Sequence, residues 1–245
     1  SRDVTQLEQA EAMRRDFVAN VSHEIRTPLT VLAGFVETLQ TLNLSDSERQ
    51  QYLGLMAQQA RRMQVLVDDL LMLSRLEGSP LPGIDTLVPV QSLMEQLQAD
   101  ARALSQLMGA DSQTEHQLEF DCAYDGRLAG SANELLSAMG NLVGNAVRYT
   151  PAGGRISVLM RQQSKGSLQF SVTDTGAGIA SEHLPRLTER FYRIDSSRSR
   201  ESGGTGLGLA IVKHVAQRHG AHLSIQSTLG AGSVFSLVFP AQRVC

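Results

Sequence analysis

A repeat of apolar residues, with alternating steps of four and three, restricts the fold of this chain more than any other feature. Such spacing averages 3.5 residues and places the side chains on one seam of a long helix, as in a coiled coil. The first repeat comprises Val18, Ile25, Leu29, Leu32, Val36 and Leu39.

A second repeat follows a short polar break at residues 41–46, where Ser45 or Asp46 can cap a new helix. It comprises Met56, Met63, Leu66, Leu70 and Leu73. Two long helices with a short connection predict an antiparallel hairpin that ends near residue 77. One hairpin cannot cover both seams, so we expect a homodimer that forms a four-helix bundle. A monomeric hairpin packed on the rest of the chain is the open alternative.

Residues 78–83 contain two prolines and two glycines, which is typical of a linker between domains. We therefore divide the chain into a first domain at 1–77, a linker at 78–84 and a second domain at 85–245. Helices are expected at 90–108, 134–149 and 207–219, and strands at 117–123, 155–161, 168–173, 222–226 and 233–239. This order predicts an α/β domain in which a mixed sheet is layered against helices.

Composition excludes several classes of protein. The chain has 245 residues, 42% of them hydrophobic, which is enough for two domains with a sizeable core. A net charge of −3 argues against a basic nucleic-acid-binding protein, and we expect no direct contact with nucleic acid. The two cysteines, Cys122 and Cys245, support neither a disulfide framework nor a cysteine metal site. No segment resembles a signal peptide or a membrane span.

A cluster of chemically active residues lies on the first helix. His23 and Thr27 are four residues apart on one face, Glu24 adjoins the histidine, and Pro28 is expected to kink the helix locally. Together they indicate a reactive imidazole. Taken alone, a histidine on a helix is equally compatible with a structural or solvated role.

A second cluster lies on the helix expected at 134–149. Asn141, Asn145 and Arg148 share one face, with Tyr149 beside them. Amide oxygens can ligate Mg²⁺, an arginine can bind phosphate, and a tyrosine ring can cover a base. The simpler interpretation is an ordinary solvent-facing surface.

A third cluster, residues 174–179, directly follows a strand. Asp174 can accept a hydrogen bond from the exocyclic amine of adenine, while Gly176 and Gly178 allow the backbone, up to Ile179, to approach a ligand. An ordinary Asp-Thr-Gly turn would have the same sequence.

The fourth cluster opens the helix expected at 207–219 and consists of Gly204, Thr205, Gly206, Leu207 and Gly208. Backbone N–H groups at a helix N-terminus bind phosphate well. The spacing matches neither a Rossmann fingerprint nor a P-loop, and a flexible hinge is the alternative.

Residues 180–204 form a long polar segment, and a loop of this length is uncommon in a compact domain unless it is a lid or disordered. Within it, Phe191 can anchor the segment while Arg193 reaches a γ-phosphate. A small hydrophobic anchor with solvated arginines is the alternative.

These clusters together resemble the conserved boxes of the sensor histidine kinases of two-component systems. The phospho-acceptor box corresponds to residues 23–29, the N box to 141–149, the G1 box to 174–179, the F box to 190–193 and the G2 box to 204–209. The boxes occur in the family's order, and the resemblance covers nearly the whole chain.

The resemblance implies a dimerising helical hairpin that presents the histidine, followed by the GHKL (Bergerat) ATP-binding α/β sandwich shared with Hsp90, DNA gyrase and MutL. It implies a protein-histidine kinase in which His23 accepts the phosphoryl group and Glu24 accepts or stabilises a proton. Arg193 would contact the γ-phosphate or its acceptor, and Thr27 would orient water for phosphatase activity on a response regulator.

The family also implies a set of contacts to ATP. Asn145 would hold Mg²⁺, Asn141 would support the phosphates, and Asp174 would bind adenine with Tyr149 packed nearby. Further nucleotide contacts are implied for Arg148, Gly176, Gly178, Ile179, Phe191, Gly204, Thr205, Gly206, Leu207 and Gly208. The basic position of the N box is often lysine in relatives, so Arg148 keeps the charge but changes the hydrogen-bond geometry.

Residues 13–24 and 187–193 narrow the resemblance to the phosphate-regulon sensor kinases of proteobacteria. We therefore expect a response regulator of that regulon as partner, and a cytoplasmic location as part of an inner-membrane protein whose membrane segment would lie upstream. Two other interpretations are an ATPase or serine kinase with the same nucleotide fold, and a non-catalytic scaffold that dimerises and docks a regulator.

Overall fold

The computed structural model describes residues 2–109, 115–194 and 204–245, with side chains described from residue 17 onward. The chain divides into two compact units, Ser1–Leu71 and Met72–Cys245, which we treat separately. Within the described ranges, no helix has both the length and the apolar character needed to cross a membrane.

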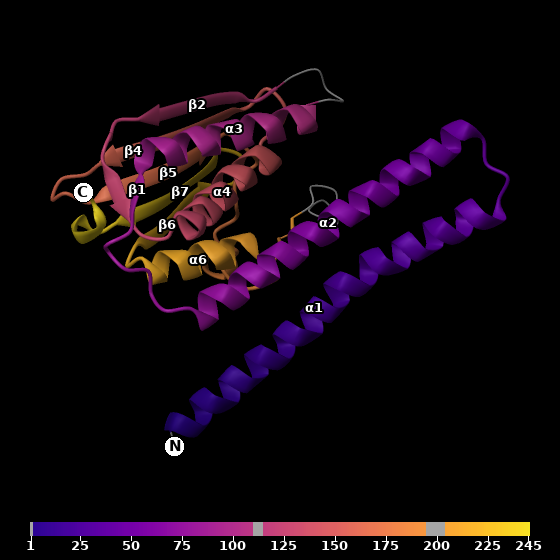
Figure 1. The fold of residues 1–245 in the computed structure, drawn as a ribbon, viewed down its shortest axis with the longest axis horizontal. Helices are drawn as coiled ribbons and strands as arrows, with labels where there is room; N and C mark the ends of the chain where they lie inside the picture. Colours follow the sequence, from indigo (N-terminus) through magenta and orange to yellow (C-terminus); the bar gives the residue numbers. More distant parts are fainter. Residues whose placement is uncertain (1, 110–114, 195–203) are drawn as a thin grey trace. The chain divides into compact units, whose positions relative to one another are not determined.

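The first unit is the predicted helical hairpin. It is built from α1 (Arg2–Thr41) and most of α2 (Asp46–Gly78), joined by a short connection (Figure 1). Ser45 and Glu48 form a capping box at the start of α2. The backbone N–H of Glu48 donates to Ser45 Oγ at 3.3 Å, and that of Ser45 donates to Glu48 Oε2 at 2.8 Å. The hydroxyl of Ser45 also donates to Glu48 Oε2, at 2.7 Å. This bond and the one from the Ser45 backbone N–H lower the pKa of the Glu48 carboxyl.

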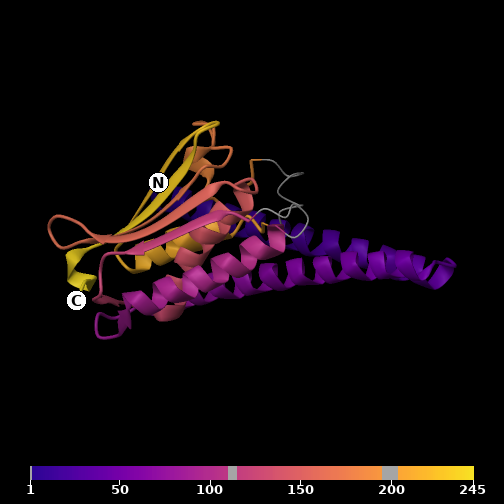
Figure 2. The same cartoon turned by 90° about the horizontal axis from the view of Figure 1, so that it is seen from above.

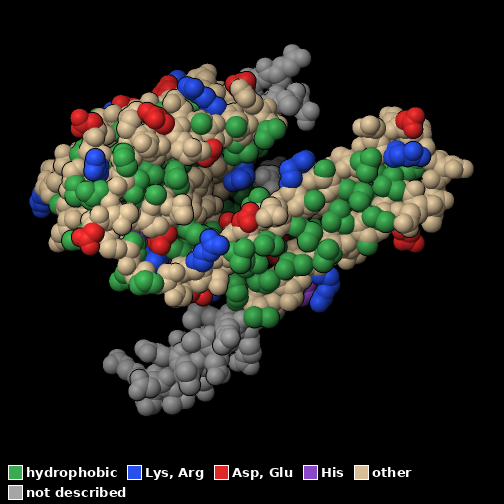
Figure 3. All heavy atoms as spheres, viewed as in Figure 1, with side chains coloured by type: hydrophobic (Ala, Val, Ile, Leu, Met, Phe, Trp, Pro, Cys, Tyr) green, Lys and Arg blue, Asp and Glu red, His purple; other side chains and the backbone are tan. Residues whose placement is uncertain are grey.

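The apolar seam of the hairpin is only partly covered within one chain. Ile25, Leu32 and Leu39 are half-buried, whereas Leu29 and Val36 keep 48% and 40% of their surface exposed. Figure 3 shows hydrophobic side chains gathered along the hairpin. The exposed members of the seam are therefore available for packing against another molecule.

The second unit contains a five-stranded mixed sheet in the order β2-β4-β5-β7-β6. Strands β2 and β4 are parallel, and the remaining neighbours are antiparallel, which confirms the predicted mixed sheet. The strands of this sheet are β2 (Gln117–Cys122), β4 (Arg155–Gln162), β5 (Leu168–Asp174), β6 (His222–Thr228) and β7 (Gly232–Phe239). All five lie close to the positions expected from the sequence.

Two short strands have no counterpart among the elements expected from the sequence. They are β1 (Leu87–Pro89) and β3 (Arg127–Ala129), which pair antiparallel in a separate small sheet. Three residues are too few for a visible alternation of apolar and polar side chains, so no sequence signal marked these strands. The described part of this unit also has 3₁₀ turns at Leu184–Arg186 and Ala241–Arg243.

Three helices cover one face of the large sheet: α3 (Val90–Gly109), α4 (Ala132–Tyr149) and α6 (Gly208–Arg218) (Figures 1 and 2). Alternate residues of β5 are buried, as expected for a strand with one face against a helical layer. Helix α4 lies between the other two helices and contributes many core residues. Its buried positions are Leu135, Ala138, Met139, Leu142, Val143, Gly144, Ala146 and Val147.

This packing predicts that Leu142→Ala destabilises the second unit. Leu142 is 1% exposed, so truncation leaves a cavity and should lower the free energy of unfolding by about 2–5 kcal/mol. Urea denaturation followed by circular dichroism measures the change. Leu107→Ala is the control, because Leu107 is 77% exposed and its truncation removes little packing. Equal losses in the two variants would contradict the assigned core.

Candidate functional site

The histidine centre lies on α1. His23 is exposed, and the hydroxyl of Thr27 donates back to the His23 carbonyl oxygen at 3.1 Å. Glu24 is half-buried and pairs with Arg62 of α2, with 3.4 Å between Oε2 and Nη2. The guanidinium therefore holds the carboxylate that adjoins the histidine. Arg62 lies 38 residues from Glu24 and belongs to no recognisable motif, so the sequence does not mark it as a site residue.

The residues of the N box lie on α4. Asn141, Asn145 and Arg148 are half-buried, and Tyr149 is 51% exposed at the end of the helix. The amide nitrogen of Asn141 donates to the carbonyl of Ser137 at 2.9 Å, so its Oδ1 points elsewhere. That oxygen lies against Gly208.

The glycines of the G2 box meet the N box at two points. A Cβ on Gly208 would overlap Asn141 Oδ1, and a Cβ on Gly204 would lie 3.4 Å from the hydroxyl of Tyr149. Between these glycines, the N–H of Leu207 donates to Thr205 Oγ1 at 3.2 Å. The backbone of this loop thus approaches the polar face of α4 closely, and at Gly208 a side chain would displace the Asn141 amide.

The G1 box meets the same end of α4. Asp174 is 7% exposed at the end of β5, and burial raises the pKa of its carboxyl, partly offset by hydrogen bonds from the N–H groups of Gly176 and Ser233. Gly176 donates to Oδ1 at 2.8 Å, and a Cβ on Gly176 would overlap the carbonyl of Tyr149. A buried carboxylate with free lone pairs can bind a donor such as an amino group.

The rest of the G1 box packs against the β6–β7 turn. Gly178 has φ +67°, and a Cβ there would overlap the carbonyl of Thr228. The N–H of Ile179 donates to Ser227 Oγ at 2.8 Å. This segment is therefore held in place by the hairpin that closes the sheet.

The F box meets the G2 box. Phe191 has φ 63°, which is uncommon for a bulky residue, and its N–H donates to the carbonyl of Gly206 at 2.9 Å. A Cβ on Gly206 would lie 2.9 Å from Phe191 Cα and 3.3 Å from Arg193 Cγ. Arg193 thus lies beside residues 204–208, which we name the glycine loop. Residues 195–203 of the expected lid lie outside the described residues.

The donor set of this unit determines which metal it can accept. In the ranges that the structure describes, no group of three or more His, Cys, Asp or Glu side chains could hold a metal ion. The half-buried amide of Asn145 offers a neutral oxygen on the face that meets the glycine loop. Mg²⁺ accepts such a ligand because phosphates and waters supply its other positions, so these residues fit a nucleotide-bound Mg²⁺.

Two family models match the chain. The His Kinase A (phospho-acceptor) domain matches residues 13–79, and the Histidine kinase-, DNA gyrase B-, and HSP90-like ATPase matches residues 130–243. The first includes the histidine centre, and the second includes the N, G1, F and G2 boxes.

Curated relatives are sensor kinases. The phosphate regulon sensor protein PhoR of Pseudomonas aeruginosa is 51% identical over 98% of this chain and 53% of its own length. The sensor-like histidine kinase SenX3 of Mycolicibacterium smegmatis is 37% identical over 97% of this chain and 60% of its own length. The chain thus spans about half to three-fifths of these relatives.

Solved structures share the fold. Full-length ShkA, crystallised with AMPPNP, aligns over 92% of this chain and 45% of its own, with 27% identity and a TM-score of 0.63. The Acinetobacter baumannii histidine kinase AdeS aligns over 89% of this chain and 98% of its own, with 21% identity and a TM-score of 0.65.

The contact between Gly208 and Asn141 predicts that Gly208→Ala abolishes most nucleotide binding, raising the Kd for ATP at least tenfold. The added Cβ would overlap Asn141 Oδ1, so the Asn141 side chain or the glycine loop must move, and both are expected to contact the phosphates. Isothermal titration calorimetry measures the change. The control is Gly140→Ala, because a Cβ at Gly140 meets only Leu97 Cδ2 at an ordinary 3.8 Å. Similar affinities for the two variants would contradict the close approach.

Proposed function

The chain belongs to the sensor histidine kinases of two-component systems, and from this premise we propose that it autophosphorylates on His23 with ATP and transfers the phosphoryl group to an aspartate of a response regulator. It would also remove the phosphoryl group from that regulator.

One observation supports the proposal most strongly, namely the meeting of the four boxes around the end of α4. Gly208 lies against Asn141, Gly176 lies against the Tyr149 carbonyl, and Gly204 lies near the Tyr149 hydroxyl. Phe191 is hydrogen-bonded to Gly206. Segments between residues 141 and 208 of the sequence thus form one polar surface next to a helix N-terminus. Backbone N–H groups at such a terminus stabilise bound phosphate.

The histidine centre can perform the chemistry of phosphoryl transfer. The far ring nitrogen of His23 would attack the γ-phosphorus in line, forming an N–P bond as the bond to ADP breaks. Glu24 would accept or stabilise the proton on the near ring nitrogen. Arg62 would orient the Glu24 carboxylate through their ion pair. Arg193 would balance charge on the phosphoryl oxygens.

The nucleotide site would bind ATP at both the adenine and the phosphates. Asp174 would accept a hydrogen bond from the adenine amine, and Tyr149 would pack near the base. Asn141 and the glycine loop would support the phosphates. Asn145 would hold Mg²⁺, which supplies positive charge against the phosphate oxygens when bound.

The family and the exposed part of the apolar seam of the hairpin both indicate which partners the chain would bind. The exposed Leu29 and Val36 would be buried in a homodimer, in which two hairpins form a four-helix bundle. The relationship to PhoR favours a PhoB-like response regulator and phosphate-regulon signalling. In that case the chain would be the cytoplasmic portion of an inner-membrane sensor.

Incubation of the chain with γ-labelled Mg·ATP tests this function. We expect label that is lost in acid, survives base and is absent from His23→Gln, because a phosphoramidate is stable in base and hydrolyses in acid. ATP binding without label would favour the scaffold or a plain ATPase. Acid-stable label in both proteins would indicate a hydroxyl acceptor, as in a serine kinase, and would contradict the role of His23.

Thr27→Ala separates the two activities proposed for the hairpin. We expect autophosphorylation to be kept and dephosphorylation of the regulator to fall at least tenfold, because the hydroxyl that orients water is removed. Assays with a phosphorylated PhoB-like regulator measure both rates. Thr41→Ala is the control, since Thr41 makes the same back-bond to a carbonyl, that of Glu37, at 2.7 Å. Equal loss of both activities in Thr27→Ala would refute the assignment.

A further inference from the structure

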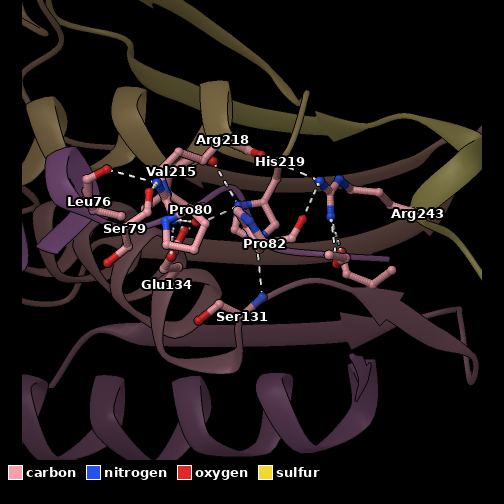
Figure 4. Close-up of polar contacts among 12 residues, drawn as sticks. Leu76, Ser79, Pro80, Pro82, Ser131, Glu134, Val215, Arg218, His219 and Arg243 are labelled. Carbon is pink, nitrogen blue, oxygen red and sulfur yellow. Dashed lines mark hydrogen bonds and ion pairs between the residues drawn. The ribbon is translucent and has the colours of Figure 1, made fainter. Parts of the chain in front are cut away.

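Arg218, the last residue of α6, uses all five of its N–H donors. Nε and Nη2 donate to the carboxylate of Glu134 in the first turn of α4, at 2.9 and 3.0 Å. Nη1 donates to the carbonyls of Leu76 and Ser79 at 2.8 and 2.9 Å, and Nη2 donates to that of Pro80 at 2.7 Å (Figure 4). The residue is 9% exposed, so one buried cation joins α4, α6 and the end of α2.

A second arginine continues this arrangement along the chain. Arg243 donates to the carbonyl of Pro82 at 3.1 Å and to that of Ala129 at 3.0 Å, with a longer contact to Gly83 at 3.4 Å. It also reaches the carbonyl of Arg218 at 3.5 Å. The two guanidinium groups therefore bind backbone carbonyls throughout residues 76–83, which we name the arm.

Two side chains in the last turns of α2 are buried in the second unit, whereas most of the arm beyond Leu76 is exposed. Leu73 and Leu76 are 1% and 4% exposed. Glu77 forms an ion pair with Arg190, whose guanidinium also lies 3.4 Å from Nε2 of His214 on α6. This agrees with the division of the chain, since the second unit begins at Met72 rather than after the helix.

The amino-acid composition of the arm predicts a flexible connection and not a fixed one. Two prolines and two glycines in eight residues are typical of a loose connection, and without bound carbonyls the arm would have many conformations. The five donors of Arg218 remove that freedom. Because its charge is buried, Glu134 is required as counter-ion, and loss of either partner leaves an uncompensated group.

Helix α6 connects the contacts of Arg218 with Glu134 and the arm, which we name the clamp, to the glycine loop. Gly208 begins the helix beside Asn141, and Arg218 ends it about 15 Å away at 1.5 Å per residue. Arg218 is therefore too distant to contact ATP, yet it is on the same rigid element.

We propose that Arg218 is a positioning residue that fixes the arm to the catalytic unit, so that the end of α2 moves with that unit as one body. Any rotation of the second unit that brings its nucleotide site to His23 then takes place within α2 before Met72, and not in the arm. The kinetic consequence rests on the proposed kinase function. A freely jointed arm would spread the unit over many orientations and make productive encounters rarer.

Arg218→Gln in the full chain tests the proposal by two measurements. Hydrogen exchange of the peptide spanning residues 76–84 should become at least tenfold faster. In autophosphorylation, kcat should fall at least fivefold while KM for Mg·ATP stays within twofold. For Arg218→Lys, both the exchange rate of the arm and kcat should lie between those of wild type and Arg218→Gln, because an ammonium cannot reproduce five forked donors.

Two further variants act as controls. Glu134→Gln keeps Arg218 and should release the arm partly, which provides a milder change if Arg218→Gln folds poorly. Arg161→Gln removes an arginine that pairs with Asp121 on the sheet at 2.8 Å and should leave both exchange of the arm and kcat unchanged.

Equal exchange of the arm in wild type and Arg218→Gln would overturn the proposal. So would a released arm with unchanged or raised kcat, or a loss confined to KM. Hydrogen exchange tests the attachment independently of His23 labelling, so failure of the proposed kinase activity is distinguishable from failure of the clamp.

Discussion

Burial of the apolar side of α4 is the interaction on which the catalytic unit depends. Leu135, Met139, Leu142 and Val147 are at most 1% exposed in the layer between sheet and helices, so the helix cannot rotate without exposing them. The opposite side must then carry Asn141, Asn145 and Arg148. Placement of the polar residues is therefore a consequence of packing, and the two glycine-rich boxes, G1 and G2, assemble against a surface that is already oriented.

Glycine has a particular role in that assembly. Gly176, Gly204 and Gly208 lie where a Cβ would contact or overlap Tyr149 or Asn141, and Gly206 lies against Phe191. Loops that approach a helix this closely can present backbone N–H groups to a ligand instead of side chains. The hairpin differs from the second unit because part of its apolar seam remains exposed. Its stability therefore depends on what covers that seam.

Much of the fold and of the site could be predicted because the signals are local. The 4-3 repeat predicted the hairpin, and the polar break with Ser45 or Asp46 as a cap predicted the start of α2. The strands of the large sheet were expected close to where they lie. The boxes were recognised from residue types at short spacing. Strands β1 and β3 were missed because three residues carry no period. Arg62 was missed because its partner is distant in sequence.

The sequence by itself determined the long helices, the strands of the large sheet and the residues of the boxes, since these depend on neighbours within a few residues. Only the tertiary structure decided what the Pro/Gly segment does. Its partners, Arg218 and Arg243, bind backbone carbonyls, and every residue has a carbonyl whatever its side chain. No residue pattern can mark such a contact. It arises because burial of α6 and α4 brings a guanidinium and its counter-ion to the place where the arm passes.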